Sequence, residues 1–103
     1  MAGKPLANIV GEQRHPATAL RLAAAAAALG RVVTMLFDGA SVVALAAPDP
    51  LLTTAIDLGV SVTACQSGLT EAGMSAIDLL PGVTTGGMVS FLAQAGDAQL
   101  LLA

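Results

Sequence analysis

An apolar strand runs directly into a polar, glycine-bearing segment at residues 60–71, Val-Ser-Val-Thr-Ala-Cys-Gln-Ser-Gly-Leu-Thr-Glu. Most of residues 60–64 are apolar or β-branched, which is typical of a buried parallel strand. The residues after Cys65 predict a short helix. A thiol that opens a helix lies at the positive end of the helix dipole, which favours the thiolate. We therefore expect a reactive cysteine at the carboxyl end of a strand.

The rest of the chain alternates between strands and helices in the same way. Strands are predicted at residues 6–10, 31–37, 60–64 and 99–103, helices at 17–29, 40–47, 51–58, 66–74 and 87–95, and a loop at 78–85. Residues 40–47 also suit a strand, because two valines precede the alanine-rich part. Strands that are apolar throughout and alternate with helices predict a single α/β domain over residues 1–103. We expect a three-layer α/β/α fold with a mainly parallel sheet of four to five strands.

Composition limits the class of protein. Hydrophobic residues make up 55% and charged residues 11% of the chain, against typical values of about 45–50% and about 25%. With so few charged side chains, part of the apolar surface remains exposed. Exposed apolar surface usually marks an interface, so we expect a homo-oligomer. The net charge is −3 with only four Lys and Arg residues, which argues against nucleic-acid binding.

The sequence also carries expectations about location. No apolar run reaches the ~20 residues of a membrane helix, so no membrane association is predicted. The first residues lack the pattern of a secretory signal. A single cysteine excludes an internal disulfide and suits a reducing compartment. These observations predict a cytoplasmic protein.

Three polar segments follow predicted strands, at the sheet edge where ligands of open parallel sheets gather. They are residues 11–15, Asp38-Gly39 and residues 65–68. His15 is either a base for Cys65 or a bound sulfur, or a solvent-facing loop residue. Asp38 either binds a ligand or hydrogen-bonds its own turn. Cys65 is either reactive or a small core residue, and the polar residues after it favour an accessible thiol.

The segment after Cys65 offers hydrogen-bonding groups for a bound anion or sulfur species. The predicted binding residues there are Gln66, Ser67, Gly68 and Thr70. Capping of the helix is enough to explain Ser67, and we favour that role. Glu71, near the first turn, meets the helix dipole favourably, whereas a carboxylate close to the thiol opposes thiolate formation.

The chain lacks residues that nucleotide and metal sites require, so we exclude both kinds of site. Residues 68–75 have the glycine and serine spacing of a phosphate loop, but Met74 stands where that loop needs lysine. Glu71 would also place negative charge beside the phosphates. One cysteine and one histidine do not assemble a metal site within one chain. We predict no cofactor and no metal.

Three stretches resemble the DsrE/DsrF-like sulfur-relay proteins. They are the alanine-rich helix with residues 30–40 (Gly-Arg-Val-Val-Thr-Met-Leu-Phe-Asp-Gly-Ala), residues 58–69 around Cys65, and residues 82–88 (Gly-Val-Thr-Thr-Gly-Gly-Met). The resemblance implies a three-layer α/β/α fold and assembly into trimers or hexamers. It also implies a cysteine that accepts sulfane sulfur as a persulfide and passes it to a partner protein, a role that falls on Cys65.

Three functions remain open at this level. The first is a small sulfur-carrier or sulfurtransferase-like protein with a persulfide on Cys65, which exchanges sulfur with donor and acceptor proteins. The second is a non-catalytic oligomeric binding or assembly subunit with an incidental Cys65. The third is peroxide sensing through a sulfenic acid, which needs a thiol from another chain because no resolving cysteine is present.

Overall fold

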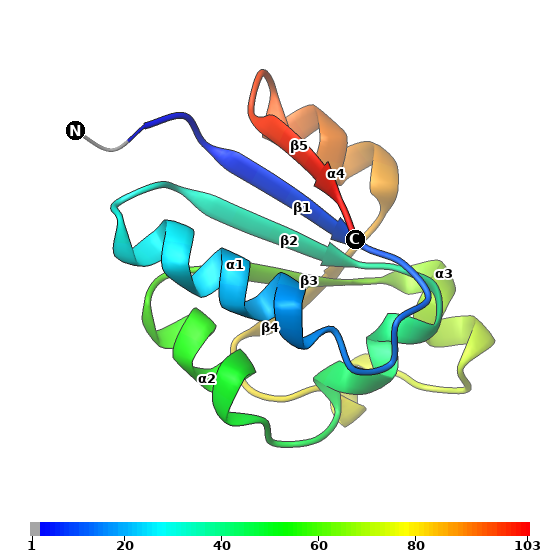
Figure 1. Ribbon diagram of the computed structural model, residues 1–103. Coiled ribbons are helices and arrows are strands. Elements are labelled where there is room, and N and C mark those ends of the chain that lie inside the picture. Colours follow the sequence, from blue (N-terminus) through cyan, green and yellow to red (C-terminus); the bar gives the residue numbers. More distant parts are fainter. Residues whose placement is uncertain (1–2) are drawn as a thin grey trace.

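A five-stranded sheet runs through the centre of the computed structural model, which describes residues 3–103 (Figure 1). Its strands are β1 (Leu6–Val10), β2 (Val33–Phe37), β3 (Ser61–Cys65), β4 (Val83–Gly86) and β5 (Gln99–Leu102). The order is β4-β3-β2-β1-β5, and every neighbouring pair is parallel. The predicted parallel sheet is confirmed, and all its carboxyl ends lie along one edge.

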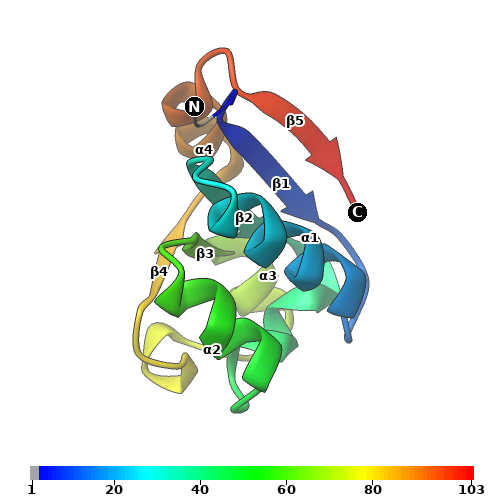
Figure 2. The same ribbon diagram turned by 60° about the vertical axis from the view of Figure 1, so that its left-hand side comes forward.

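Helices lie on both faces of this sheet. They are α1 (Ala17–Ala28), the 3₁₀ helix η1 (Gly39–Leu45), α2 (Pro50–Asp57), α3 (Gln66–Glu71), the 3₁₀ helix η2 (Ala76–Asp78) and α4 (Met88–Ala95). Helices α1 and α2 cover one face, called the front face here, and α4 lies against the other, the back face (Figures 1 and 2). The predicted three-layer α/β/α arrangement is therefore confirmed.

Local sequence explains where the front helices begin and end. Helix α1 follows Pro16, consists largely of alanine, the strongest helix former, and is followed by Gly30 with a φ of 89°. Helix α2 begins at Asp49, whose Oδ1 accepts a hydrogen bond from the Leu51 N–H at 2.9 Å. Gly59, with a φ of 96°, ends it as predicted.

Three elements differ from the sequence prediction. Residues 83–86 form β4 instead of a loop, and this edge strand pairs only with β3. Residues 39–45 form a 3₁₀ helix, where the sequence suited both a helix and a strand. Helix α3 ends at Glu71 rather than near Met74, because Gly73 takes a positive φ of 70° and turns the chain.

Strand register divides the core into two parts. Alternate strand residues, such as Leu6, Met35 and Val62, point to the front face and join the large apolar cluster under α1 and α2. The intervening residues point to the back face, where a smaller buried cluster consists of Ala7, Ile9, Leu36, Cys65 and Phe91. The back face therefore has the thinner cover.

Among residues 3–103, no single helix is long and apolar enough to cross a membrane. Residues 39–45 and 50–57 meet the length and hydropathy requirement only as a pair, with a bend of 85° between them.

Candidate site around Cys65

Cys65 lies where the sequence predicts it, at the last position of β3 and directly before α3. It occupies the N-cap position of that helix with φ −68° and ψ 126°, and its side chain makes no capping hydrogen bond. The short loop-free junction follows from the sequence, since the apolar strand is followed at once by polar residues that begin a helix. The thiol of Cys65 therefore lies at the carboxyl end of β3, next to the start of α3.

The thiol is more enclosed than the sequence indicates. Only 5% of Cys65 is exposed, and it belongs to the buried back-face cluster with Leu36 and Phe91. Phe91 belongs to α4 and lies 26 positions after Cys65 in the sequence. The polar residues next to Cys65 therefore do not indicate that the thiol is covered. The expectation of an accessible thiol is therefore wrong for the isolated chain.

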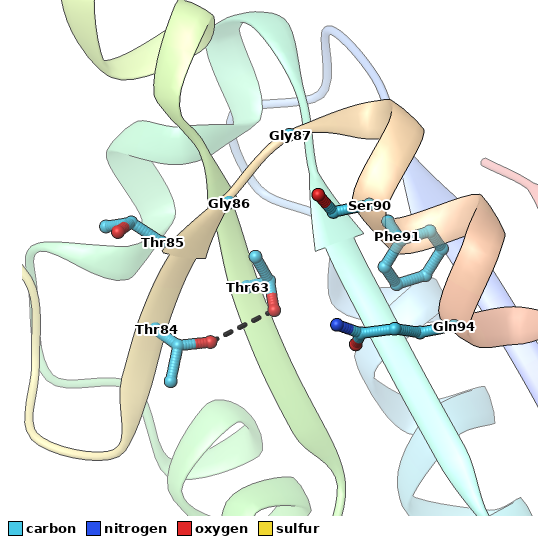
Figure 3. A pocket seen from close by; sticks show the side chains of 8 residues that line it. All are labelled: Thr63, Thr84, Thr85, Gly86, Gly87, Ser90, Phe91 and Gln94. Atoms are coloured by element: carbon cyan, nitrogen blue, oxygen red, sulfur yellow. Dashed lines mark hydrogen bonds between the residues drawn. The ribbon is translucent and has the colours of Figure 1, made fainter.

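A pocket of about 270 Å³ lies on the back face, between the β3–β4 edge and α4 (Figure 3), and Cys65 is not one of the residues that line it. It is lined by Thr63, Thr84, Thr85, Gly86, Gly87, Ser90, Phe91 and Gln94. Thr63 precedes Cys65 by two residues on the same strand and therefore points to the same face. Phe91 belongs to the buried cluster of Cys65 and also lines the pocket. The pocket and the thiol therefore share a wall.

Gly86 lines the pocket beside this shared wall. It is the register partner of Cys65 in the neighbouring strand β4. A Cβ atom built there would lie 3.2 Å from Thr63 Cγ2, which is tighter than an ordinary contact, and within 4 Å of no atom of Cys65. The absence of a side chain at Gly86 therefore makes room for Thr63 on the pocket wall.

Three of the predicted binding residues after Cys65, Gln66, Ser67 and Thr70, lie on the outside of α3. Gln66 and Ser67 are exposed in its first turn, and no side chain caps the helix, so the predicted capping role of Ser67 is wrong. Thr70 Oγ1 donates a hydrogen bond to the Gln66 carbonyl at 3.1 Å. Glu71 is the last residue of α3 rather than part of its first turn, and it is exposed.

Gly68 has a packing role. It is buried, and a Cβ atom there would lie 3.0 Å from Val42 Cγ1 and 3.2 Å from the backbone N and O of Gly39. Helix α3 therefore approaches η1 closely only because residue 68 is glycine. This contact also brings the Asp38-Gly39 turn to the carboxyl edge next to α3, as the strand order predicts.

His15 lies away from the thiol, and the Asp38 backbone hydrogen-bonds within its own turn. The Asp38 carbonyl accepts a hydrogen bond from Ser41 Oγ at 2.7 Å, while its side chain makes no capping bond to η1. His15 is exposed and lines a different pocket of about 300 Å³ with Pro48 and Asp49. Cys65 points to the back face, so the structure does not bring the imidazole and the sulfur together.

Sequence reasoning missed the five polar side chains that line the pocket, Thr63, Thr84, Thr85, Ser90 and Gln94. The three threonines lie in stretches that carry the family resemblance, but no binding role was predicted for them. A signal is nevertheless present, because residues 79–96 contain no charged residue although many of them are exposed. In the part of the chain that the structure describes, no three His, Cys, Asp or Glu side chains lie close enough together to hold a metal ion.

The arrangement of strands and helices is similar to that of solved proteins. The ychN protein from E. coli superposes with a TM-score of 0.84 over 98% of this chain and 100% of that chain, at 18% sequence identity. BT1422, a conserved protein of unknown function from Bacteroides thetaiotaomicron, gives a TM-score of 0.73 at 19% identity over 95% of this chain and 94% of its own.

The chain therefore shares the fold of these two proteins. This agrees with the three-layer fold that the sequence resemblance implies. Identities of this size relate the backbones and carry no statement about activity. No protein-family model matches the sequence, and no curated protein matches it either. The chemistry of the chain has to be inferred from its own residues.

Proposed function

We propose that this protein is a DsrE-like sulfur carrier that holds sulfane sulfur as a persulfide on Cys65. The observation that carries the proposal is that Phe91 packs in the buried cluster of Cys65 and also lines the back-face pocket, so the thiol and the pocket share this wall. A second support is the apolar cluster around the thiol, because a polarizable sulfur atom packs well against apolar and aromatic groups.

The transfer step is a displacement at sulfur. The Cys65 thiolate attacks the outer sulfur of a donor persulfide, R–S–SH, and forms a new S–S bond. The bond between the two donor sulfurs breaks, and the donor leaves as the thiolate R–S⁻ with the bonding electrons. Cys65 then holds the group –S–SH, and the same displacement by an acceptor thiolate removes it. No external oxidant or reductant enters either step.

This proposal gives the pocket a defined part in the reaction. Only 5% of Cys65 is exposed, so the donor sulfur has to enter beside Phe91, from the pocket that this ring also lines, once α4 has moved away from the sheet. Gln66, in the first turn of α3, and Thr70, near its end, are exposed, and we propose that they contact the donor or acceptor on the rim. His15 has no part in the displacement.

The test is sulfur uptake by variants of the thiol and of its cover. Wild type incubated with a sulfane-sulfur donor is expected to gain one sulfur atom in intact mass, and Cys65→Ser is expected to gain none. Phe91→Ala removes the ring that covers the thiol and is expected to speed uptake. Leu92→Ala is the matched control, because Leu92 lies on the same helix, is exposed and does not line the pocket. Equal uptake by both α4 variants would contradict the route beside Phe91.

A second function is favoured by one observation, the burial of Cys65. A thiol packed among Leu36, Ile9 and Phe91 also suits a non-catalytic binding or assembly subunit. In that case Cys65→Ser leaves every function of the protein intact, and wild type takes up no sulfur. The mass measurement therefore separates the two functions.

We also propose that the protein assembles with copies of itself. Leu100 and Leu102 of the edge strand β5 lie in register with Ala7 and Ile9, so they point to the back face, and Leu102 is 77% exposed. Exposed apolar side chains on a free sheet edge favour pairing with another chain. Sedimentation velocity of wild type and of Leu102→Lys tests this. The variant is expected to shift toward the monomer, and a monomeric wild type would overturn the proposal.

A further inference from the structure

The back-face pocket has the chemistry of a binding site that does not depend on sulfur. Its volume of about 270 Å³ is slightly below the ~300–1,000 Å³ of drug-sized ligand sites, which suits a smaller molecule. Ser90 and Gln94 project from α4 toward the strands, with Phe91 between them, and Thr63 and Thr84 project from the opposite wall (Figure 3). Polar groups from α4, β3 and β4 therefore converge on one small volume.

The two threonines leave acceptor positions free. Thr63 Oγ1 and Thr84 Oγ1 lie 3.1 Å apart, and Thr84 Oγ1 donates to the Val62 carbonyl at 3.3 Å. If the only proton of Thr84 serves that carbonyl, the bond between the hydroxyls is donated by Thr63. Both hydroxyl oxygens then keep lone pairs toward the pocket, so this wall accepts hydrogen bonds from a ligand.

The helix wall both donates and accepts. Within residues 3–103, Ser90 and Gln94 make no side-chain hydrogen bond. They lie one helical turn apart and therefore project from the same side of α4. A hydroxyl and a carboxamide each offer both donor and acceptor atoms. A ligand that fits both walls carries several hydroxyl or amide groups of its own.

The absence of charged residues around the pocket favours a neutral ligand over an ion. No residue that lines the pocket is charged, and residues 79–96 contain no Asp, Glu, Lys or Arg. An ion that loses water in the pocket would find no counter-charge there. The ring of Phe91 adds an apolar wall, against which the C–H face of a small ring compound packs.

From these observations we propose that the back-face pocket binds a small, uncharged, polyhydroxylated molecule of about monosaccharide size. The ligand donates to the Thr63–Thr84 pair, exchanges hydrogen bonds with Ser90 and Gln94, and packs on Phe91. The proposal goes beyond the sulfur-carrier function and does not rest on it, because none of these contacts involves the Cys65 sulfur.

The experiment is an amide NMR titration of the full chain with three neutral probes, D-glucose, sorbitol and glycerol, and with sodium sulfate as the anionic probe. We expect saturable shifts of the amides of Thr84, Gly86 and Gly87 with at least one neutral probe, and none with sulfate. Gln94→Leu with Ser90→Ala is expected to weaken binding at least tenfold. Gln13→Leu is the matched control, since Gln13 is exposed in the loop before α1 and does not line the pocket.

Two results would overturn the proposal. The first is the absence of saturable shifts at the pocket with all three neutral probes. The second is a response to sulfate alone, which would make the start of α4 an anion site instead. Cys65→Ser distinguishes this proposal from the sulfur-carrier function. The variant is expected to bind the neutral probe as wild type does while it takes up no sulfur.

Discussion

The front face of the sheet is filled with buried apolar side chains, whereas the back face ends in a polar pocket over β3 and β4. Helices α1 and α2 close the front with Leu20, Leu52 and several alanines, and the side chains beneath them are almost fully buried. The back is covered by the eight residues of α4, of which only Phe91 is buried. The front face of the sheet therefore contributes most of the stability, and the back face carries the candidate site.

The two phenylalanines of the chain allow a direct comparison of the faces. Phe37 is 0% exposed under the front helices, and Phe91 is 8% exposed on the back. Phe37→Ala is expected to lower the free energy of unfolding by about 3–5 kcal/mol, because it leaves a cavity in a closely packed core. Phe91→Ala is expected to cost about 1–3 kcal/mol, since α4 is free to settle onto the sheet.

Urea unfolding of both variants measures this difference. A cost for Phe91→Ala equal to or above that of Phe37→Ala would contradict the division into a stabilising front face and a thinly covered back face. Phe91→Ala also opens the pocket wall beside Cys65, so alkylation of the thiol by iodoacetamide is expected to become faster than in wild type. Phe37→Ala has no comparable effect, because Phe37 points to the front.

One polar residue interrupts the front core. Asn8 is 0% exposed in β1, and neither its Oδ1 nor its Nδ2 has a hydrogen-bond partner in residues 3–103. An unpaired buried amide costs about 1–3 kcal/mol. Asn8→Leu keeps a similar shape and is expected to raise the free energy of unfolding by that amount.

Thermal or urea unfolding of Asn8→Leu checks this expectation. Asn8→Asp serves as the opposite control, because a buried carboxylate without a partner lowers stability. A loss of stability in Asn8→Leu would show that the amide has a partner or a role that the isolated chain does not reveal. The front face would then no longer be purely structural.

The contact between α3 and η1 gives the smallest of the three effects. Gly68→Ala places a Cβ 3.2 Å from the Gly39 backbone, which cannot move as a side chain does. The clash is expected to cost about 1–2 kcal/mol net of the better helix propensity of alanine. Gly87→Ala, with open space around its Cβ, loses only the preference for glycine at the N-cap of α4 and is expected to cost less than about 1 kcal/mol. Equal costs would remove the packing role of Gly68.

The sequence predicts the front of the molecule better than the back, for a physical reason. Strands β1 to β3 and helix α1 are apolar runs or strong helix formers with clear breakers, so local composition decides them. Strand β4 is an edge strand with the sequence Val-Thr-Thr-Gly, and half of its residues are exposed. Such a strand needs no continuous apolar run, and it was therefore predicted as a loop.

The candidate site divides in the same way. The position of Cys65 at the end of β3 and before α3 follows from neighbouring residues and was predicted. Its burial depends on Phe91, and the pocket depends on Thr84 and Gln94, which come together with Thr63 only through the strand order and the path of α4. Contacts of this kind leave no local pattern. The role of Gly68 was likewise assigned to binding, because close packing against Gly39 is a tertiary property.

The central claim is that the sulfur of Cys65 is chemically active despite its cover. The most direct measurement is intact-mass spectrometry of the reduced protein after incubation with a sulfane-sulfur donor, with Cys65→Ser treated in parallel. We predict the addition of one sulfur atom to wild type, its removal by a thiol reductant, and no addition to Cys65→Ser. Wild type of unchanged mass, or equal addition to both proteins, would contradict the account and leave a binding or assembly subunit.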